Sequence, residues 1–76
     1  MMMKLSNAKK GNKGKIIKIE GNKDFKKKLF VMGLLEGEDF IVENIAPFGS
    51  PIVVSVKSSK VALRKEEAEN IIVDIN

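Results

Sequence analysis

Glycine and proline residues divide this chain into short segments, and this division restricts its fold more than any other feature. Six glycines and two prolines are spread over 76 residues. Both residue types interrupt helices and strands, so the segments between them are short. Short segments of this kind are typical of strands in a small, partly open β-barrel. We therefore expect one mainly β domain over residues 1–76, with about five strands.

The strands are predicted from alternating apolar and polar residues. In the segment 14–21, Ile17 and Ile19 are expected to face the core, and Ile16 is expected on the outer face. In the next strand, Phe40 and Val42 share one face. The remaining strands follow the same pattern and are expected at 52–57, at 60–64 after a connection at Ser58 and Ser59, and at 71–75.

One helix is expected to be inserted after the first strand, within "DFKKKLFVMGLLEGEDF". Phe25, Leu29 and Met32 recur at helical spacing and form one apolar stripe that should pack on the core. Gly33 is the expected end of this helix. Shorter helical turns are expected at "LSNAKKG", which supplies Leu5 and Ala8 to the core, and at "KEEAEN".

The charge of the chain is moderately basic, with 14 Lys and Arg against 10 Asp and Glu. A basic domain meets the first criterion for nucleic-acid binding, but that function also requires the charge to gather on one face. Here the lysines are scattered, apart from Lys26 to Lys28, and the four phenylalanines do not alternate with lysines as stacking platforms do. We expect no nucleic-acid partner and keep such a module as the alternative function.

Residues for catalysis and for binding transition metals are scarce. The chain has no histidine and no cysteine, which are the commonest catalytic groups and the preferred soft or borderline metal ligands. Its glycines do not form a phosphate-binding pattern. The acidic groups at 36–39 and 66–69 are interpreted as an exposed turn and a first helical turn, where the helix dipole favours acids. The expectation is no enzyme, no catalytic residue, no metal site and no cofactor.

The longest apolar run, Leu29 to Leu35, is interrupted by Gly33. It is much shorter than the roughly 20 residues that span a bilayer. The first residues also lack the apolar region of a signal peptide. A cytoplasmic protein without membrane insertion is therefore expected.

Four motifs occur in order and cover nearly the whole chain: "KLSNAKKGNKGKIIKIEG", "KKLFVMGLLEGEDFIV", "APFGSPIVVSV" and "VALRKEEAENIIV". Together they resemble the ferrous iron transport protein A family (FeoA). The resemblance implies an SH3-like barrel without catalytic activity. It also implies an accessory protein that binds and modulates a membrane ferrous iron transporter through the transporter's cytoplasmic GTPase part. The same fold occurs in metal-dependent repressors, so a regulatory module is the alternative.

Three positions depart from the pattern of that family. Lys28 stands where the family usually has arginine, which replaces a planar guanidinium by a point charge. Ser50 replaces the aspartate of a Pro-x-Gly-Asp-Pro loop, which removes an acid that would fix the loop. Ser58 stands where the hairpin usually has glycine.

The candidate partner-binding residues are Lys28, Val31, Leu35 and Phe48. Val31 and Leu35 lie outside the apolar stripe, and Phe48 lies on a loop between two prolines. Exposed apolar groups beside lysines are typical of a docking surface. In the alternative interpretation, Phe48 folds back over an open end of the barrel and Val31 is merely exposed. Weak homo-oligomerisation through the outer strand of the hairpin is also possible.

Overall fold

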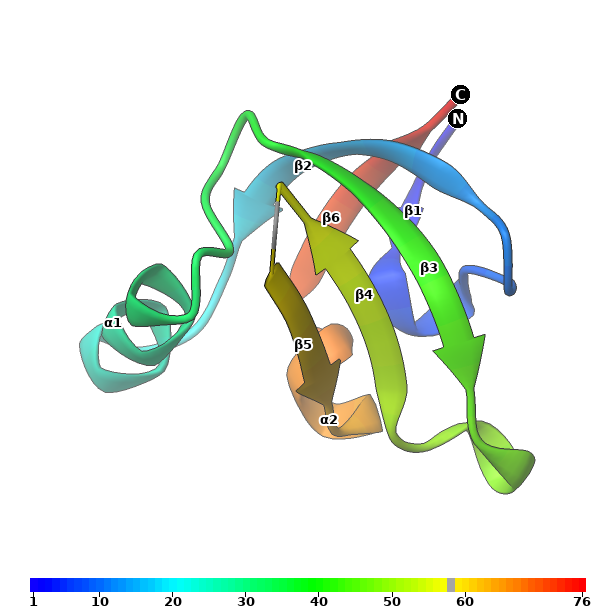
Figure 1. The fold of residues 1–76 in the computed structure, drawn as a ribbon. Coiled ribbons are helices and arrows are strands. Elements are labelled where there is room, and N and C mark those ends of the chain that lie inside the picture. The colour runs from blue at the N-terminus through cyan, green and yellow to red at the C-terminus, as the bar shows by residue number, and fades with distance from the viewer. Residues whose placement is uncertain (58) are drawn as a thin grey trace.

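A six-stranded antiparallel sheet curves around the core in this computed structural model, which describes residues 1–57 and 59–76 (Figure 1). The strand order is β1-β6-β2-β3-β4-β5, so β1 and β5 are the two edges. The strands are β1 (Met2–Lys4), β2 (Lys13–Ile19), β3 (Asp39–Ile45), β4 (Ile52–Val56), β5 (Ser59–Leu63) and β6 (Ile71–Ile75). This arrangement confirms the predicted mainly β, partly open barrel.

The helices are short and lie outside the sheet. They are the 3-10 turns η1 (Leu5–Asn7) and η2 (Pro47–Gly49) and the α-helices α1 (Lys23–Val31) and α2 (Lys65–Ala68). Helix α1 begins after Asn22, whose side-chain oxygen accepts a hydrogen bond of 2.8 Å from the backbone N–H of Phe25. Leu29 is fully buried, while Phe25 and Met32 pack against the core from its edge. The predicted apolar stripe is therefore confirmed.

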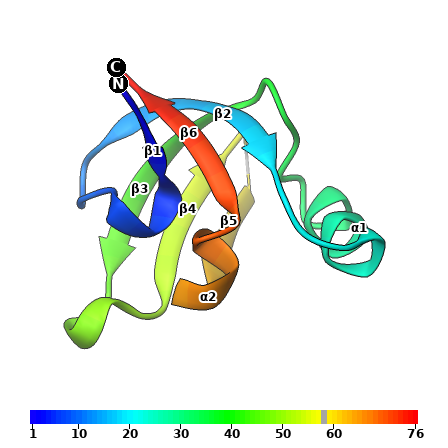
Figure 2. The same ribbon diagram turned by 180° about the vertical axis from the view of Figure 1, so that it is seen from behind.

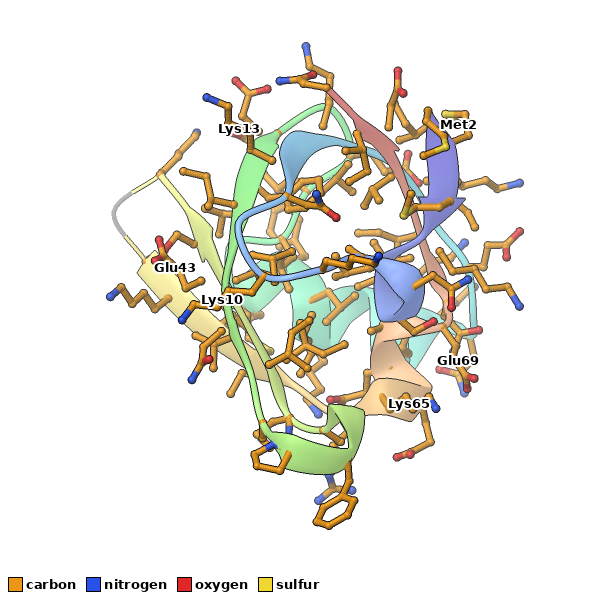
Figure 3. All side chains as sticks on the ribbon, turned by 90° about the vertical axis from the view of Figure 1, so that its right-hand side faces the viewer. Met2, Lys10, Lys13, Glu43, Lys65 and Glu69 are labelled. Atoms are coloured by element: carbon orange, nitrogen blue, oxygen red, sulfur yellow. The ribbon has the colours of Figure 1, made fainter. Side chains whose placement is uncertain are left out.

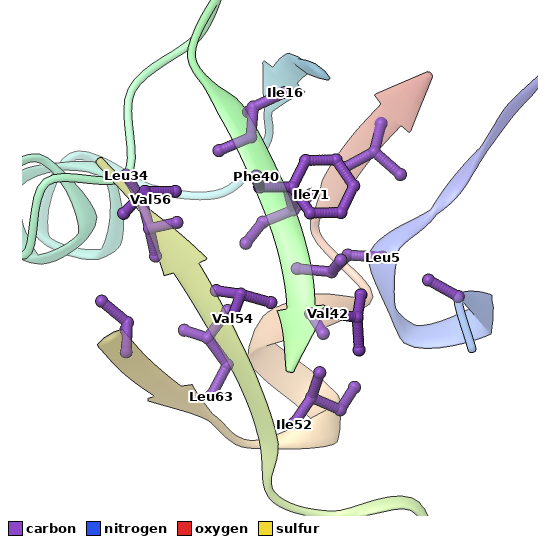
Figure 4. Close-up of a cluster of buried hydrophobic side chains, with 14 of the residues drawn as sticks. Leu5, Ile16, Leu34, Phe40, Val42, Ile52, Val54, Val56, Leu63 and Ile71 are labelled. Atoms are coloured by element: carbon purple, nitrogen blue, oxygen red, sulfur yellow. The ribbon is translucent and has the colours of Figure 1, made fainter. Parts of the chain in front are cut away.

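Aliphatic side chains and one phenylalanine fill the core (Figure 4). The predicted inward residues Phe40 and Val42 are both buried, and the hairpin contributes Val54 and Leu63 from β4 and β5. Among the residues that the structure describes, no polar or charged side chain is buried. The core is thus held by apolar packing, the main favourable term in folding.

The predicted facing of Ile16 and Ile17 is wrong. Ile16 is 1% exposed and Ile17 is 39% exposed, whereas Ile19 is buried as predicted. The pairing of β2 with β6 shifts its register between Ile16 and Lys18. Such a bulge places an additional residue in one strand and changes which side chains face inward. Strict alternation therefore fails at this point.

Strand β1 was not predicted, and it raises the number of strands from about five to six. It pairs with β6, with Met3 opposite Val73. A strand of three residues is too short to show a periodic pattern. In the predicted hairpin connection, Ser59 is the first residue of β5, and Ser58 lies outside the described residues.

Candidate partner-binding surface

Helix α1 carries two large apolar side chains that face solvent. Phe30 is 67% exposed and Val31 is 76% exposed, and both belong to the last turn of the helix. Both are off the buried stripe, because Leu29 occupies the core-facing position. Large apolar groups gathered at one place on a small protein often mark an interaction site. We call Phe30, Val31 and the half-buried Leu35 the α1 patch.

A shallow hollow of about 420 Å³ lies beside this patch. Leu34 is buried at its wall, and Glu36 accepts a hydrogen bond of 2.9 Å from the backbone N–H of Ile19, which joins the two sides of the hollow. The hollow is therefore mainly apolar with charged groups at its rim. Its lining residues are Ile19, Lys26, Phe30, Leu34, Leu35 and Glu36.

Lys28 takes part in an ion pair within the chain. Its ammonium lies 2.5 Å from the Glu67 carboxylate, so it joins α1 to α2. The other oxygen of Glu67 accepts a hydrogen bond of 2.9 Å from the backbone N–H of Arg64 at the start of α2. The hydrogen bond from Lys28, followed by that from Arg64, holds the pKa of Glu67 below its ordinary value.

Phe48 projects from the turn η2, and its side chain is fully exposed. The alternative in which it folds back over the barrel is therefore wrong. Its backbone has φ +71°, in the left-handed region that residues other than Gly, Asn and Asp seldom adopt. Backbone hydrogen bonds of 3.0 Å from Gly49 to Ala46 and from Ala46 to Pro51 fix the turn. Phe48 is thus presented to solvent by a defined backbone.

Ser50 fastens the same loop to α2. Its hydroxyl oxygen accepts a hydrogen bond of 3.1 Å from the backbone N–H of Lys65. The loop therefore has an anchor although the aspartate expected from the family pattern is absent. Backbone N–H groups in the first turn of a helix have no intrahelical acceptor, so a neighbouring oxygen can satisfy one of them.

The structure divides the four residues predicted for partner binding into two places. Lys28 and Val31 belong to α1, and Leu35 lines the adjoining hollow. The turn that carries Phe48 lies on the opposite side of the molecule in both views (Figures 1 and 2). Phe30 was not among the predicted site residues. Its position outside the apolar stripe of α1 already indicated that its side chain would face solvent.

The lysines do not gather on one face. Lys10 and Lys13 project on one side of the molecule, whereas Lys65 projects on the other (Figure 3). Some lysines are also neutralised in pairs, for example Lys57 with Glu38 at 3.1 Å. In the described part of the chain, no three acidic, His or Cys residues form a group that could hold a metal ion. Within the same residues, no helix has the length and apolar character needed to cross a membrane.

The curved six-stranded antiparallel sheet is that of a small SH3-like barrel protein. A family model described as the FeoA domain matches residues 3–75. The chain belongs to the FeoA family, a family of iron transport proteins, as the four sequence motifs predicted.

Solved structures support both the family and the fold. A crystal structure described as the iron uptake regulatory protein FeoA superposes with a TM-score of 0.91, at 32% identity over 100% of both chains. Iron(II) transport protein A from Clostridium thermocellum gives 0.90 at 36% identity, over 96% of this chain and 45% of that one. The zinc complex of Stenotrophomonas maltophilia FeoA, described as an SH3 domain protein, gives 0.75 at 26% identity, over 95% of this chain and 89% of that one.

A longer relative combines two proteins in one chain. It is the Fe(2+) transport protein A/Fe(2+) transporter FeoB fusion protein of Porphyromonas gingivalis, 32% identical over 73 residues. The match covers 96% of this chain and 9% of the relative. This chain therefore corresponds to a small part of that fusion protein.

Proposed function

We propose that this chain is an accessory protein of a ferrous iron uptake system, and that it binds and modulates the cytoplasmic GTPase part of the membrane transporter. The fusion relative is the observation that carries this proposal, because one chain there contains both an FeoA-like part and a transporter. Fusion keeps two proteins at a high effective concentration. A separate accessory protein needs a surface with enough affinity to achieve the same association.

The α1 patch is the surface that we assign to the transporter. Phe30 and Val31 are exposed side by side in one helical turn, and Leu35 extends the apolar area. Of the lysines on α1, only Lys28 forms an ion pair within the described residues. The patch is therefore apolar with a basic rim, which suits an apolar partner surface with acidic groups around it.

In this proposal, Lys28 positions the patch and does not itself bind the partner. Its ion pair with Glu67 fixes α1 against α2, in addition to the packing of Leu29 and Phe25 against the core. Holding an interface in its bound geometry reduces the entropy lost on association. The arginine more usual at this position would hold the carboxylate with two parallel bonds, which a lysine cannot form.

We propose binding and no catalysis for this chain. It contains no histidine or cysteine, and its hollow beside α1 is shallow and mainly apolar. Such a site can hold a side chain of a partner. General acid–base chemistry would require titratable groups positioned at a reacting atom.

Capture of the transporter from solubilised membranes by the immobilised chain tests the proposal. The wild type should capture the full-length transporter. Val31→Asp should capture at least about tenfold less, because it places a charge at a side chain that the proposed complex buries. Phe48→Asn is the control, because it changes an exposed apolar residue that lies away from α1. Equal capture by the wild type and Val31→Asp would remove the α1 patch from the proposal. Loss with Phe48→Asn alone would place the contact at η2.

A further inference from the structure

The turn η2 forms one end of the molecule, and this end carries few charges. It joins β3 to β4 and lies opposite the end at which the two chain termini meet (Figures 1 and 2). Residues 44–56 are the longest stretch without an ionisable side chain, in a chain of which 32% of the residues are charged. Pro47, Phe48 and Pro51 are exposed within this stretch. The surface at η2 is therefore apolar where the rest of the chain is rich in charge.

Phe48 is the most exposed large apolar side chain among the described residues. An aromatic ring in water forgoes the favourable burial of its apolar surface. Its left-handed backbone is also strained for a residue of this size. Unfavourable local conformations that persist in a folded protein occur often at functional sites. Phe48 is therefore a candidate anchor for something outside this chain.

The shape of this end favours a lipid surface over a protein partner. The hollow beside α1 and the one beside β2, β3 and β4 are both lined by residues outside the loop 46–51. Phe48 is thus a projection, and a protein would need a matching cavity to receive it. The boundary between headgroups and acyl chains of a bilayer accepts apolar side chains to a depth of about 5–10 Å without such a cavity.

The backbone of the loop also suits an apolar surrounding, in which an unpaired N–H group is costly. Pro47 and Pro51 have no N–H group. Those of Gly49 and Ala46 donate hydrogen bonds of 3.0 Å to the carbonyl oxygens of Ala46 and Pro51. Four of the six residues in the loop 46–51 therefore bring no unpaired N–H group to a membrane. The tip can enter the bilayer boundary at a small desolvation cost.

Positive charges lie at the base of this projection. The Ser50 hydroxyl accepts a hydrogen bond of 3.1 Å from the backbone N–H of Lys65, which places the start of α2 beside the loop. Arg64 and Lys65 are both exposed there, and the exposed Glu66 follows them. The group has one excess positive charge. Basic residues near a bilayer are attracted by anionic lipids, so the charge complements an anionic headgroup layer.

We propose that η2 docks this chain on the surface of an anionic lipid bilayer. The Phe48 ring enters the boundary below the headgroups, and Arg64 and Lys65 contact the phosphate groups. Binding through one apolar anchor and two cations is weak and reversible. Helix α1 lies away from η2 in both ribbon views, so the α1 patch stays accessible on the docked chain (Figures 1 and 2).

A tryptophan placed at η2 reports the insertion directly. The chain has no tryptophan, so Phe48→Trp and the matched control Val31→Trp each carry a single indole at an exposed position. Vesicles of equimolar phosphatidylglycerol and phosphatidylcholine are added to the intact chain up to about 1 mM lipid, the range of weak anchoring. The emission of Phe48→Trp should shift to shorter wavelength as the indole leaves water. The emission of Val31→Trp should stay unchanged.

Cosedimentation with the same vesicles measures the contributions to binding. Phe48→Asn keeps the left-handed backbone accessible and should lower the partition coefficient about tenfold or more. Lys65→Gln should lower it about fivefold, whereas Lys60→Gln is the control that removes the same charge from β5. Binding of the wild type should weaken on pure phosphatidylcholine vesicles and in about 0.5 M NaCl, which screens surface charges.

Three results would overturn the proposal: a folded wild type that does not bind the anionic vesicles, binding by Phe48→Asn equal to that of the wild type, or bound Phe48→Trp whose emission does not shift. Circular dichroism establishes that each variant is folded. If Phe48→Asn reduced capture of the solubilised transporter while vesicle binding stayed unchanged, η2 would be a protein contact and the proposal would fail. The vesicles contain no transporter, so the proposed function does not depend on this result.

Discussion

At the scale of single residues, Gly14 shows how one missing side chain permits two neighbouring strands to lie close together. A Cβ atom at this position would lie 1.9 Å from the backbone carbonyl oxygen of Asp74 in β6. This separation is far below van der Waals contact, and the neighbour is backbone that cannot turn away. Gly14 therefore allows β2 and β6 to approach closely.

We predict that Gly14→Ala lowers the free energy of unfolding by about 3 kcal/mol, the upper part of the range for overpacked sites. Urea denaturation followed by circular dichroism would measure the change. Gly33→Ala serves as the comparison, because a Cβ there meets no atom within 4 Å but has φ +90°. It should cost only about 1–2 kcal/mol from backbone conformation. A Gly14→Ala protein as stable as the wild type would contradict this description of the two strands.

Phe48 leads to the opposite prediction. Since its side chain is fully exposed and its backbone is left-handed, Phe48→Asn loses no packing and relieves strain. The variant should be more stable than the wild type by about 1 kcal/mol, which corresponds to a melting temperature higher by roughly 4–8 °C in a domain of this size. Calorimetry would test this. A lower melting temperature would indicate that the ring packs within the fold.

At the scale of secondary structure elements, the short helix α2 links the two exposed apolar sites. The backbone N–H of Lys65 binds the Ser50 hydroxyl, which fixes the loop of η2, and Glu67 pairs with Lys28 on α1. A four-residue helix has little stability of its own. These contacts and the buried Ala68 therefore hold α2 in place. The same contacts connect α2 to the loop of η2 and to α1.

The ion pair predicts a pH dependence. The pKa of Glu67 is lowered in the folded chain, first by the hydrogen bond from Lys28 and then by that from Arg64. A group with a lowered folded pKa stabilises the fold fully above its ordinary value, about 4.3 for glutamate, and this contribution is lost as the pH falls through the lowered value. The pair should therefore contribute at neutral pH and disappear in acid.

Lys28→Met tests this contribution while keeping an apolar stem of similar length. The wild type should be more stable than Lys28→Met by up to about 1 kcal/mol at pH 7, because Lys28 is half exposed. The difference should shrink as the pH falls below about 4. Urea unfolding at several pH values measures it. A stability difference that does not change with pH would exclude the ion pair as its cause.

The elements also show what the sequence alone can predict. Phe25, Leu29 and Met32 identified α1 because their helical spacing is a local property, and Phe40 and Val42 identified β3 in the same way. Ile16 and Ile17 were reversed because a bulge depends on the partner strand, which the local pattern of β2 does not contain. Strand β1 was missed because its three residues become a strand only by pairing with β6.

At the scale of the whole molecule, the candidate site depends on distances that no local pattern gives. Lys28, Val31, Leu35 and Phe48 were predicted as one set from their apolar or basic character. The fold then placed Phe48 on the opposite side from α1 and engaged Lys28 with Glu67, a residue 39 positions further along the chain. The composition of the surface was predictable, whereas its division into two separate sites required the tertiary structure.

The central claim is that the α1 patch binds the cytoplasmic GTPase part of a ferrous iron transporter. Fluorescence anisotropy of the labelled chain, titrated with that isolated part, tests it most directly at a chain concentration on the order of 1 µM. The account predicts saturable binding by the wild type and Phe48→Asn, with affinity reduced about tenfold or more in Val31→Asp. Folded wild-type chain that shows no saturable binding, or that binds no better than Val31→Asp, would contradict it.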